Sequence, residues 1–173
     1  MTGPADRAGT ADPGQVLLGI YINDHLAGAT GGLELARRTA GAHRGTAAGT
    51  TLARLANEIE EDREALLELM AALDVPVRQY KVASAWLAEK VGRLKLNGRL
   101  LDRSPLSSLV ELETLRLGVE GKASLWRTML LVAQHEQRLD SSPLGTLLHR
   151  ANSQLETLEA MRMEAATEVF SPA

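Results

Sequence analysis

The sequence contains no cysteine. Disulfide bonds, thiolate catalysis and cysteine-ligated zinc or iron–sulfur sites are therefore excluded. Aromatic residues are also scarce, at 3% of 173 residues, whereas small and aliphatic residues together with Glu and Arg dominate. This composition is typical of an all-α protein, and the length is sufficient for one domain with a sizeable core.

Long hydrophobic runs and an excess of positive charge are absent as well. No apolar run, Met129–Ala133 included, approaches the roughly 20 residues needed to span a bilayer. The formal net charge is −3, which disfavours a general nucleic-acid binder because neutralising phosphates requires a basic face. We therefore expect a soluble, cytoplasmic protein that contacts neither membrane nor nucleic acid.

Residues 1–11 are small and polar and lack the apolar core of a signal peptide, so we expect a disordered leader followed by one helical-bundle domain over residues 12–170. Within that domain, an N-capping residue followed by proline marks three helix starts, Asp12-Pro13, Ser104-Pro105 and Ser142-Pro143. Apolar residues at three–four spacing predict five helices, at about 12–41, 50–73, 78–96, 104–133 and 142–169.

The lengths and loops predict a topology. Four of the helices are long, and the short loops at 41–49 and 133–142 require antiparallel neighbours. The shorter helix at 78–96 lies between the two hairpins and can carry the chain back along the bundle. We therefore expect an all-α four-helix bundle with this helix as its crossover.

On this order and length of helices, residues 13–169 resemble the ferritin-like four-helix-bundle superfamily, in the form found in uncharacterised actinobacterial proteins. Di-iron members of that superfamily carry one carboxylate on each of two helices and a Glu-x-x-His motif on each of the other two. No glutamate lies three residues before any of the four histidines here, so the di-iron motif is not retained. The resemblance accordingly implies no metal ligand and no cofactor.

Polar residues interrupt the apolar stripes near the middle of the predicted bundle. Asp62 breaks the leucine stripe of helix 50–73, and His25 replaces a core residue in helix 12–41. Counted from the shared end of the bundle, both lie within roughly 5 Å of Glu120 and Gln154 along the axis. These residues are the candidate site.

Two interpretations of this level remain open. In the first, His25, Asp62 and Glu120, with Asp24 or Glu58 nearby, form a metal or acid–base site, and one imidazole with two or three carboxylates suits Fe, Mn or Zn. In the second, His25 bonds to Asp62 in a buried polar layer that fixes helix register. The incomplete ligand pattern favours the second interpretation.

The run of Gly28, Gly31 and Gly32 also allows two interpretations. The glycines predict either a close-packing surface, for Trp86 or for a partner helix, or room for an apolar small-molecule ligand whose identity is unknown. Nucleophilic catalysis has no support, because no Gly-x-Ser-x-Gly, phosphate-binding loop or dinucleotide fingerprint is present. We predict no catalytic residue.

The sequence therefore favours a non-catalytic binding or interaction protein. Apolar residues lie all round helix 12–41, with Leu17, Ile20, Tyr21 and Leu35 off its main stripe, so we expect a homodimer. The alternative is a metal-carboxylate oxidoreductase that uses Fe or Mn at the middle of the bundle.

Overall fold

The computed structural model describes residues 12–78 and 105–171. In these ranges the chain is helical without any strand, as predicted, and it forms four helices: α1 (Pro13–Ala42), α2 (Ala47–Ala72), α4 (Pro105–Val132) and α5 (Ser141–Phe170). Of the predicted helix at 78–96, residues 79–96 with Trp86 lie outside the described residues, and Arg78 is not helical. None of the four described helices combines the length and the apolar character that crossing a membrane requires.

The helix starts follow from local capping. Asp12 caps α1 by accepting a hydrogen bond from the Gly14 amide at 3.1 Å, with Pro13 at the first helical position, which confirms the predicted start. Helix α5 begins slightly earlier than predicted, because Asp140 and not Ser142 is its cap. The Asp140 carboxylate accepts from the Ser142 amide at 2.8 Å, which draws Ser142 into the first turn.

The turn between α1 and α2 is tighter than predicted. Instead of a loop over 41–49, α1 continues to Ala42 and α2 begins at Ala47, capped by Thr46, whose hydroxyl accepts from the Gly49 amide at 3.0 Å. A Cβ atom at position 49 would lie only 2.1 Å from the carbonyl oxygen of His43. The close approach of the two chain segments therefore requires glycine at this position.

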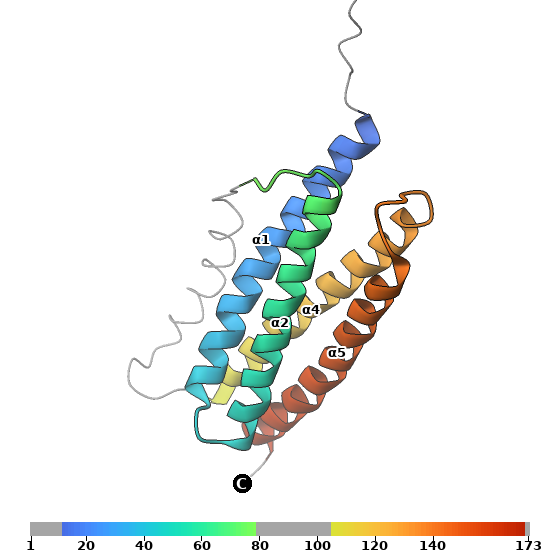
Figure 1. Ribbon diagram of the computed structural model, residues 1–173. Coiled ribbons are helices and arrows are strands. Elements are labelled where there is room, and N and C mark those ends of the chain that lie inside the picture. Colours follow the sequence, from blue (N-terminus) through green and yellow to red (C-terminus); the bar gives the residue numbers. More distant parts are fainter. Residues whose placement is uncertain (1–11, 79–104, 172–173) are drawn as a thin grey trace, which may run out of the picture.

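Figure 1 shows two antiparallel helix pairs, α1 with α2 and α4 with α5. The pairs join where α1 packs against α4, whereas α2 and α5 approach each other least closely of the neighbouring helices. The first turns of α1 project beyond the end of α2 (Figure 1). We call the side of the bundle between α2 and α5 the α2–α5 seam.

The core is built from apolar side chains of all four helices. The predicted stripe of α2 is confirmed, since each of its members is buried: Leu52, Leu55, Ile59, Leu66, Leu69 and Leu73. Helix α4 contributes the fully buried Trp126 and Met129, and α5 contributes Ala151 and Leu158. Asp62 lies within this core, between the levels of Ile59 and Leu66.

The packing partner predicted for the glycine run of α1, Trp86, lies outside the described residues, so packing at this run stays a prediction. A Cβ atom built at Gly28 or Gly32 has no described atom within 4 Å, whereas Gly31 is buried. Glycine at 28 and 32 thus permits no close approach between described residues.

Candidate functional site

The charged residue at the centre of the bundle is Asp62, whose side chain is 1% exposed. Helix α2 turns it inward because it follows Ile59 by three residues and precedes Leu66 by four, and both face the core. A buried carboxylate costs several kcal/mol unless it is paired and hydrogen-bonded. Its partners therefore decide what it can do.

Two cations from the other hairpin hold the Asp62 carboxylate. Lys122 of α4 donates from Nζ to Oδ2. Arg150 of α5 donates from Nε to Oδ1 at 2.7 Å, and a second nitrogen of its guanidinium pairs with the same oxygen. A weaker bond of 3.4 Å runs from Gln154 Nε2 to Oδ2. An ionised carboxylate offers about four acceptor positions, so these four contacts use its whole capacity.

Gln154 of α5 connects Lys122 to a second carboxylate of α2, that of Glu58. Its side chain is buried, its Oε1 accepts from Lys122 Nζ, and its Nε2 donates to Glu58 Oε2 at 3.0 Å. Because the amide both accepts from α4 and donates to α2, it fixes α5 relative to both helices.

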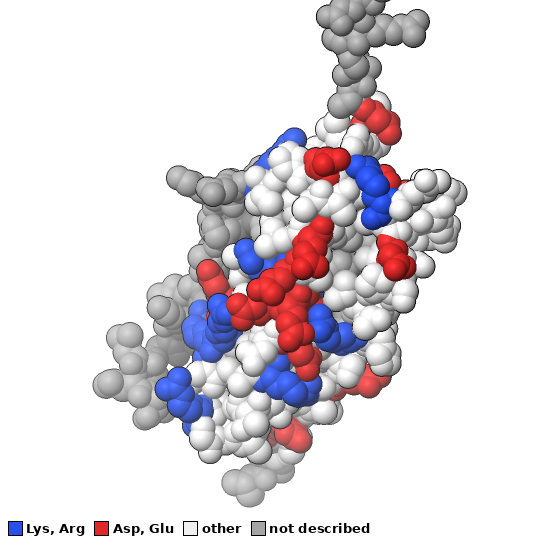
Figure 2. Space-filling view, viewed as in Figure 1, with Lys and Arg blue, Asp and Glu red and all other residues white. Residues whose placement is uncertain are grey.

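Ion pairs at the surface complete the cluster. Arg150 also donates from Nη1 to Glu61 at 2.7 Å, and Arg54 pairs with Glu58 one turn away on α2. We call the whole cluster the polar network, and it consists of Arg54, Glu58, Glu61, Asp62, Lys122, Arg150 and Gln154. Its three cations balance its three carboxylates. Figure 2 shows the surface of this region, where Asp and Glu form a band flanked by Lys and Arg.

Burial lowers the pKa of Lys122, and the negative charge of Asp62 and its hydrogen bond act in the opposite direction. The Arg150 charge lowers the pKa further, and Glu58 raises it. The protonated state of this lysine therefore depends on Asp62 as its partner.

Of the sequence-predicted residues, the structure brings together Asp62 and Glu58, which share Gln154. It gives Asp62 other partners than the predicted His25. The ring of His25 instead lies edge-on to Tyr21 on the same helix, with centroids 4.6 Å apart, and Tyr21 bonds through its hydroxyl to Thr128 of α4 at 3.2 Å. Burial lowers the pKa of His25, and the Asp24 charge acts against this.

Asp24 and Glu120 lie away from the polar network. Asp24 is exposed on α1, and the Glu120 side chain is 47% exposed and pairs with Arg127 at 3.2 Å. Within residues 12–78 and 105–171, no group of three or more His, Asp or Glu residues is arranged to hold a metal ion.

Sequence reasoning missed the two cations, although a signal for one of them was present. Lys122 lies three residues after Val119 and four before Trp126, so it occupies the buried stripe of α4. Arg150 lies one turn before Gln154 on α5, which places both side chains toward α2.

Asn23 is a further buried polar residue that was not predicted as part of a site. Its Nδ2 donates to the carbonyl oxygens of Gly19, at 2.8 Å, and Pro76, at 3.1 Å, and its Oδ1 accepts from the Arg78 amide at 2.7 Å. Asn23 thereby ties the segment that follows α2 to α1.

Comparisons of this chain with protein-family models, curated proteins and solved structures found no match.

Proposed function

We propose that this chain is a non-catalytic helical-bundle protein that acts through binding or interaction, as a cytoplasmic homodimer. The observation that carries the proposal is the pairing of Asp62 with Lys122 and Arg150. In this proposal the polar network holds the two hairpins in register.

The chemistry of the network supports a structural role. A general base needs a free lone pair toward its substrate, and a metal ligand needs one toward the ion. The contacts of Lys122, Arg150 and Gln154 use the acceptor positions of Asp62, and the two positive charges would repel a metal cation. A fully paired buried network fits a device that specifies helix register.

The path of the chain supports a ferritin-like topology as part of this proposal. Helix α2 ends near the end of the bundle where α1 begins, whereas α4 begins near the opposite end (Figure 1). The two helices thus run parallel, so the end of α2 and the start of α4 lie at opposite ends of the bundle. Two antiparallel hairpins with one long crossover are the ferritin-like connection.

Metal analysis separates this proposal from its alternative, an Fe or Mn oxidoreductase. The full chain is purified without chelator, incubated with Fe²⁺ or Mn²⁺, desalted and analysed by mass spectrometry for bound metal. We expect far less than one metal ion per chain, with no difference between the wild type and Asp62→Asn. Stoichiometric Fe or Mn that is lost in Asp62→Ala and His25→Ala would contradict the proposal.

A further inference from the structure

The projecting end of α1 carries an exposed apolar patch. Val16, Leu17 and Ile20 are exposed on its first turns, and Val77 is exposed in the segment that follows α2. We call these four residues the α1-end patch. The other exposed large apolar residues among the described ranges lie singly along α4 and α5, namely Leu106, Leu117, Leu131, Met163 and Phe170.

The uncharged sequence at the start of α1 and the hydrogen bonds of the Asn23 side chain define this patch. From Pro13 to Asn23, α1 has no charged residue, although a helix that faces water normally carries charge on that face. Since Asn23 bonds to the residues on both sides of Val77, namely Pro76 and Arg78, it fixes Val77 beside α1. The patch is therefore a defined surface and not a loose terminus.

A groove lies next to the patch, between the start of α1 and residues 74–78. Its volume is about 150 Å³, and its apolar lining comes from Val16, Gly19, Val75 and Pro76. The absence of a side chain at Gly19 opens the space, since a Cβ there would already lie 3.7 Å from Val75. Apolar space of this size accepts a benzene-sized group, which is about the bulk of one leucine side chain.

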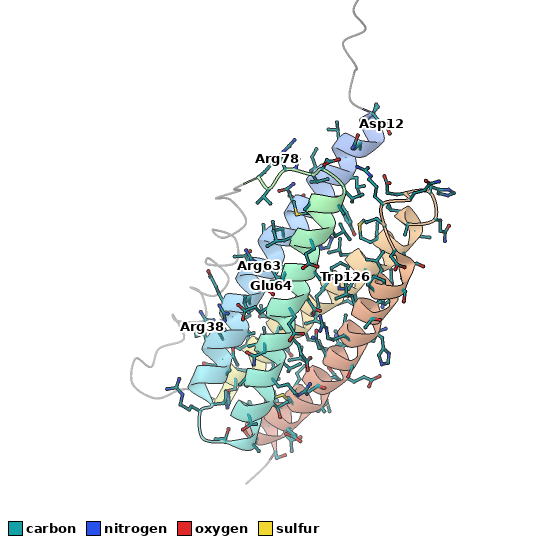
Figure 3. The ribbon with its side chains drawn as sticks, in the orientation of Figure 1. Asp12, Arg38, Arg63, Glu64, Arg78 and Trp126 are labelled. Carbon is teal, nitrogen blue, oxygen red and sulfur yellow. The ribbon has the colours of Figure 1, made fainter. Side chains whose placement is uncertain are left out.

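The groove also has a charged group of each sign in its lining, Asp74 and Arg78. Both are exposed, and Asp74 remains 86% exposed although it pairs with Arg138. Figure 3 labels Asp12 at the projecting tip of α1 and Arg78 at the end of the segment that follows α2. An apolar projection, an apolar groove and one charge of each sign thus meet at one end of the molecule.

We propose that the α1-end patch is the surface through which two copies of this chain associate, each inserting Leu17 into the groove of the other. A twofold axis places the same surface on both subunits, so that the surface must complement itself. The apolar projection and groove satisfy this requirement, and Arg78 would face Asp74 of the partner subunit. The inference rests on the homodimer named in the proposed function and assigns its interface.

The test is sedimentation equilibrium of the full-length chain over concentrations on the order of 1 μM to 1 mM, which covers weak and moderate dimers. We expect a dimer whose dissociation constant rises at least tenfold in Leu17→Glu. Leu117→Glu is the matched control, because Leu117 on α4 is 68% exposed and Leu17 is 66% exposed. The control should dimerise as the wild type does.

Val77→Glu gives a second measurement outside the helix and should weaken the dimer in the same direction. Circular dichroism establishes that the variants fold. A chain that stays monomeric throughout the range would overturn both the inference and the homodimer. A dimer unaffected by Leu17→Glu and Val77→Glu would overturn this interface alone, whereas the metal analysis of Asp62 tests the rest of the proposed function independently.

Discussion

Lys122 of α4 donates a hydrogen bond to Asp62 of α2 inside the bundle, and with it joins one hairpin to the other. Both side chains are largely withdrawn from water, with 12% and 1% exposed. Of the neighbouring helices, α2 and α5 on either side of the seam make the least backbone contact. The long polar side chains of the network therefore provide hydrogen bonds between helices that otherwise contact each other little.

Removing one member of this pair should be costly, because its partner then stays charged and buried. We expect Lys122→Met to lower the free energy of unfolding by about 3 kcal/mol, the typical cost of breaking a buried ion pair. Urea unfolding followed by circular dichroism measures this change. In the double variant Lys122→Met with Asp62→Leu, the loss should be smaller than the sum of the two single losses.

The matched control is Arg127→Met, which removes an ion pair with Glu120 on the surface of α4. Both members of that pair are nearly half exposed, so its removal should change the unfolding free energy by no more than about 0.5 kcal/mol. Equal effects of Lys122→Met and Arg127→Met would show that burial gives the Asp62 pair no special weight.

Asn23 should contribute to the stability of the fold, because its side chain forms hydrogen bonds with three backbone groups. Asn23→Ala removes the donor to Pro76 and the acceptor for the Arg78 amide. Leaving a buried backbone group unpaired costs about 1–3 kcal/mol, and the hydrogen bonds to Pro76 and Arg78 are partly buried. We therefore expect a loss of about 2 kcal/mol in urea unfolding, together with faster hydrogen exchange of the Arg78 amide.

Thr30 offers the comparison for Asn23. It is also polar and on α1, but it is exposed and bonds to its own helix at Leu26 and to Arg63. Thr30→Ala should leave the exchange rate of the Arg78 amide unchanged. If the Arg78 amide exchanged at the wild-type rate in Asn23→Ala, its hydrogen bond to Asn23 would not stabilise the segment that follows α2.

The helices could be predicted from sequence because their signals are local. Asp12-Pro13 specifies the start of α1 through bonds within two residues, and the leucines of α2 repeat at a spacing that only a helix brings to one face. Asp62 was recognisable for the same reason, since it interrupts that spacing. Such features depend on neighbours along the chain.

The partners of Asp62 depend on tertiary packing and were not predictable in the same way. Counting residues gives the height of His25 along the bundle axis, but the contact also depends on how each helix is rotated about its own axis. In the structure His25 lies against Tyr21, whereas Lys122 and Arg150 reach Asp62 through flexible side chains several bonds long. A lysine within an apolar stripe is the signal that would have identified Lys122.

Replacing glycine by alanine should have opposite effects on stability at Gly49, where an added Cβ would clash with the backbone, and at Gly28, where it would not. Gly49→Ala would place a Cβ 2.1 Å from the carbonyl oxygen of His43, so the turn between α1 and α2 must shift. We expect a loss of about 3 kcal/mol, at the upper end of the cost of overpacking. Thermal or urea unfolding measures it.

Gly28→Ala is the counterpart inside α1, where no described atom would lie within 4 Å of the added Cβ. Alanine has a higher helix propensity than glycine by about 1 kcal/mol, so this variant should be more stable than the wild type. A destabilised Gly28→Ala variant would reveal a close contact at this face of α1.

The dependence of stability on pH should report on His25. Burial lowers its pKa in the folded chain below the ordinary value of 6.5, so between these two pKa values the unfolded chain binds more protons than the folded chain. The contribution of His25 to stability is therefore fully present above pH 6.5 and is lost as the pH falls through its folded pKa. His25→Gln, which does not titrate, should reduce the slope of unfolding free energy against pH in this range.

The measurement is urea unfolding at several pH values from about 7 down to about 5. The comparison variant is His149→Gln, which replaces an exposed histidine of α5. A slope that His25→Gln leaves unchanged would mean that burial does not disfavour the charged His25 ring.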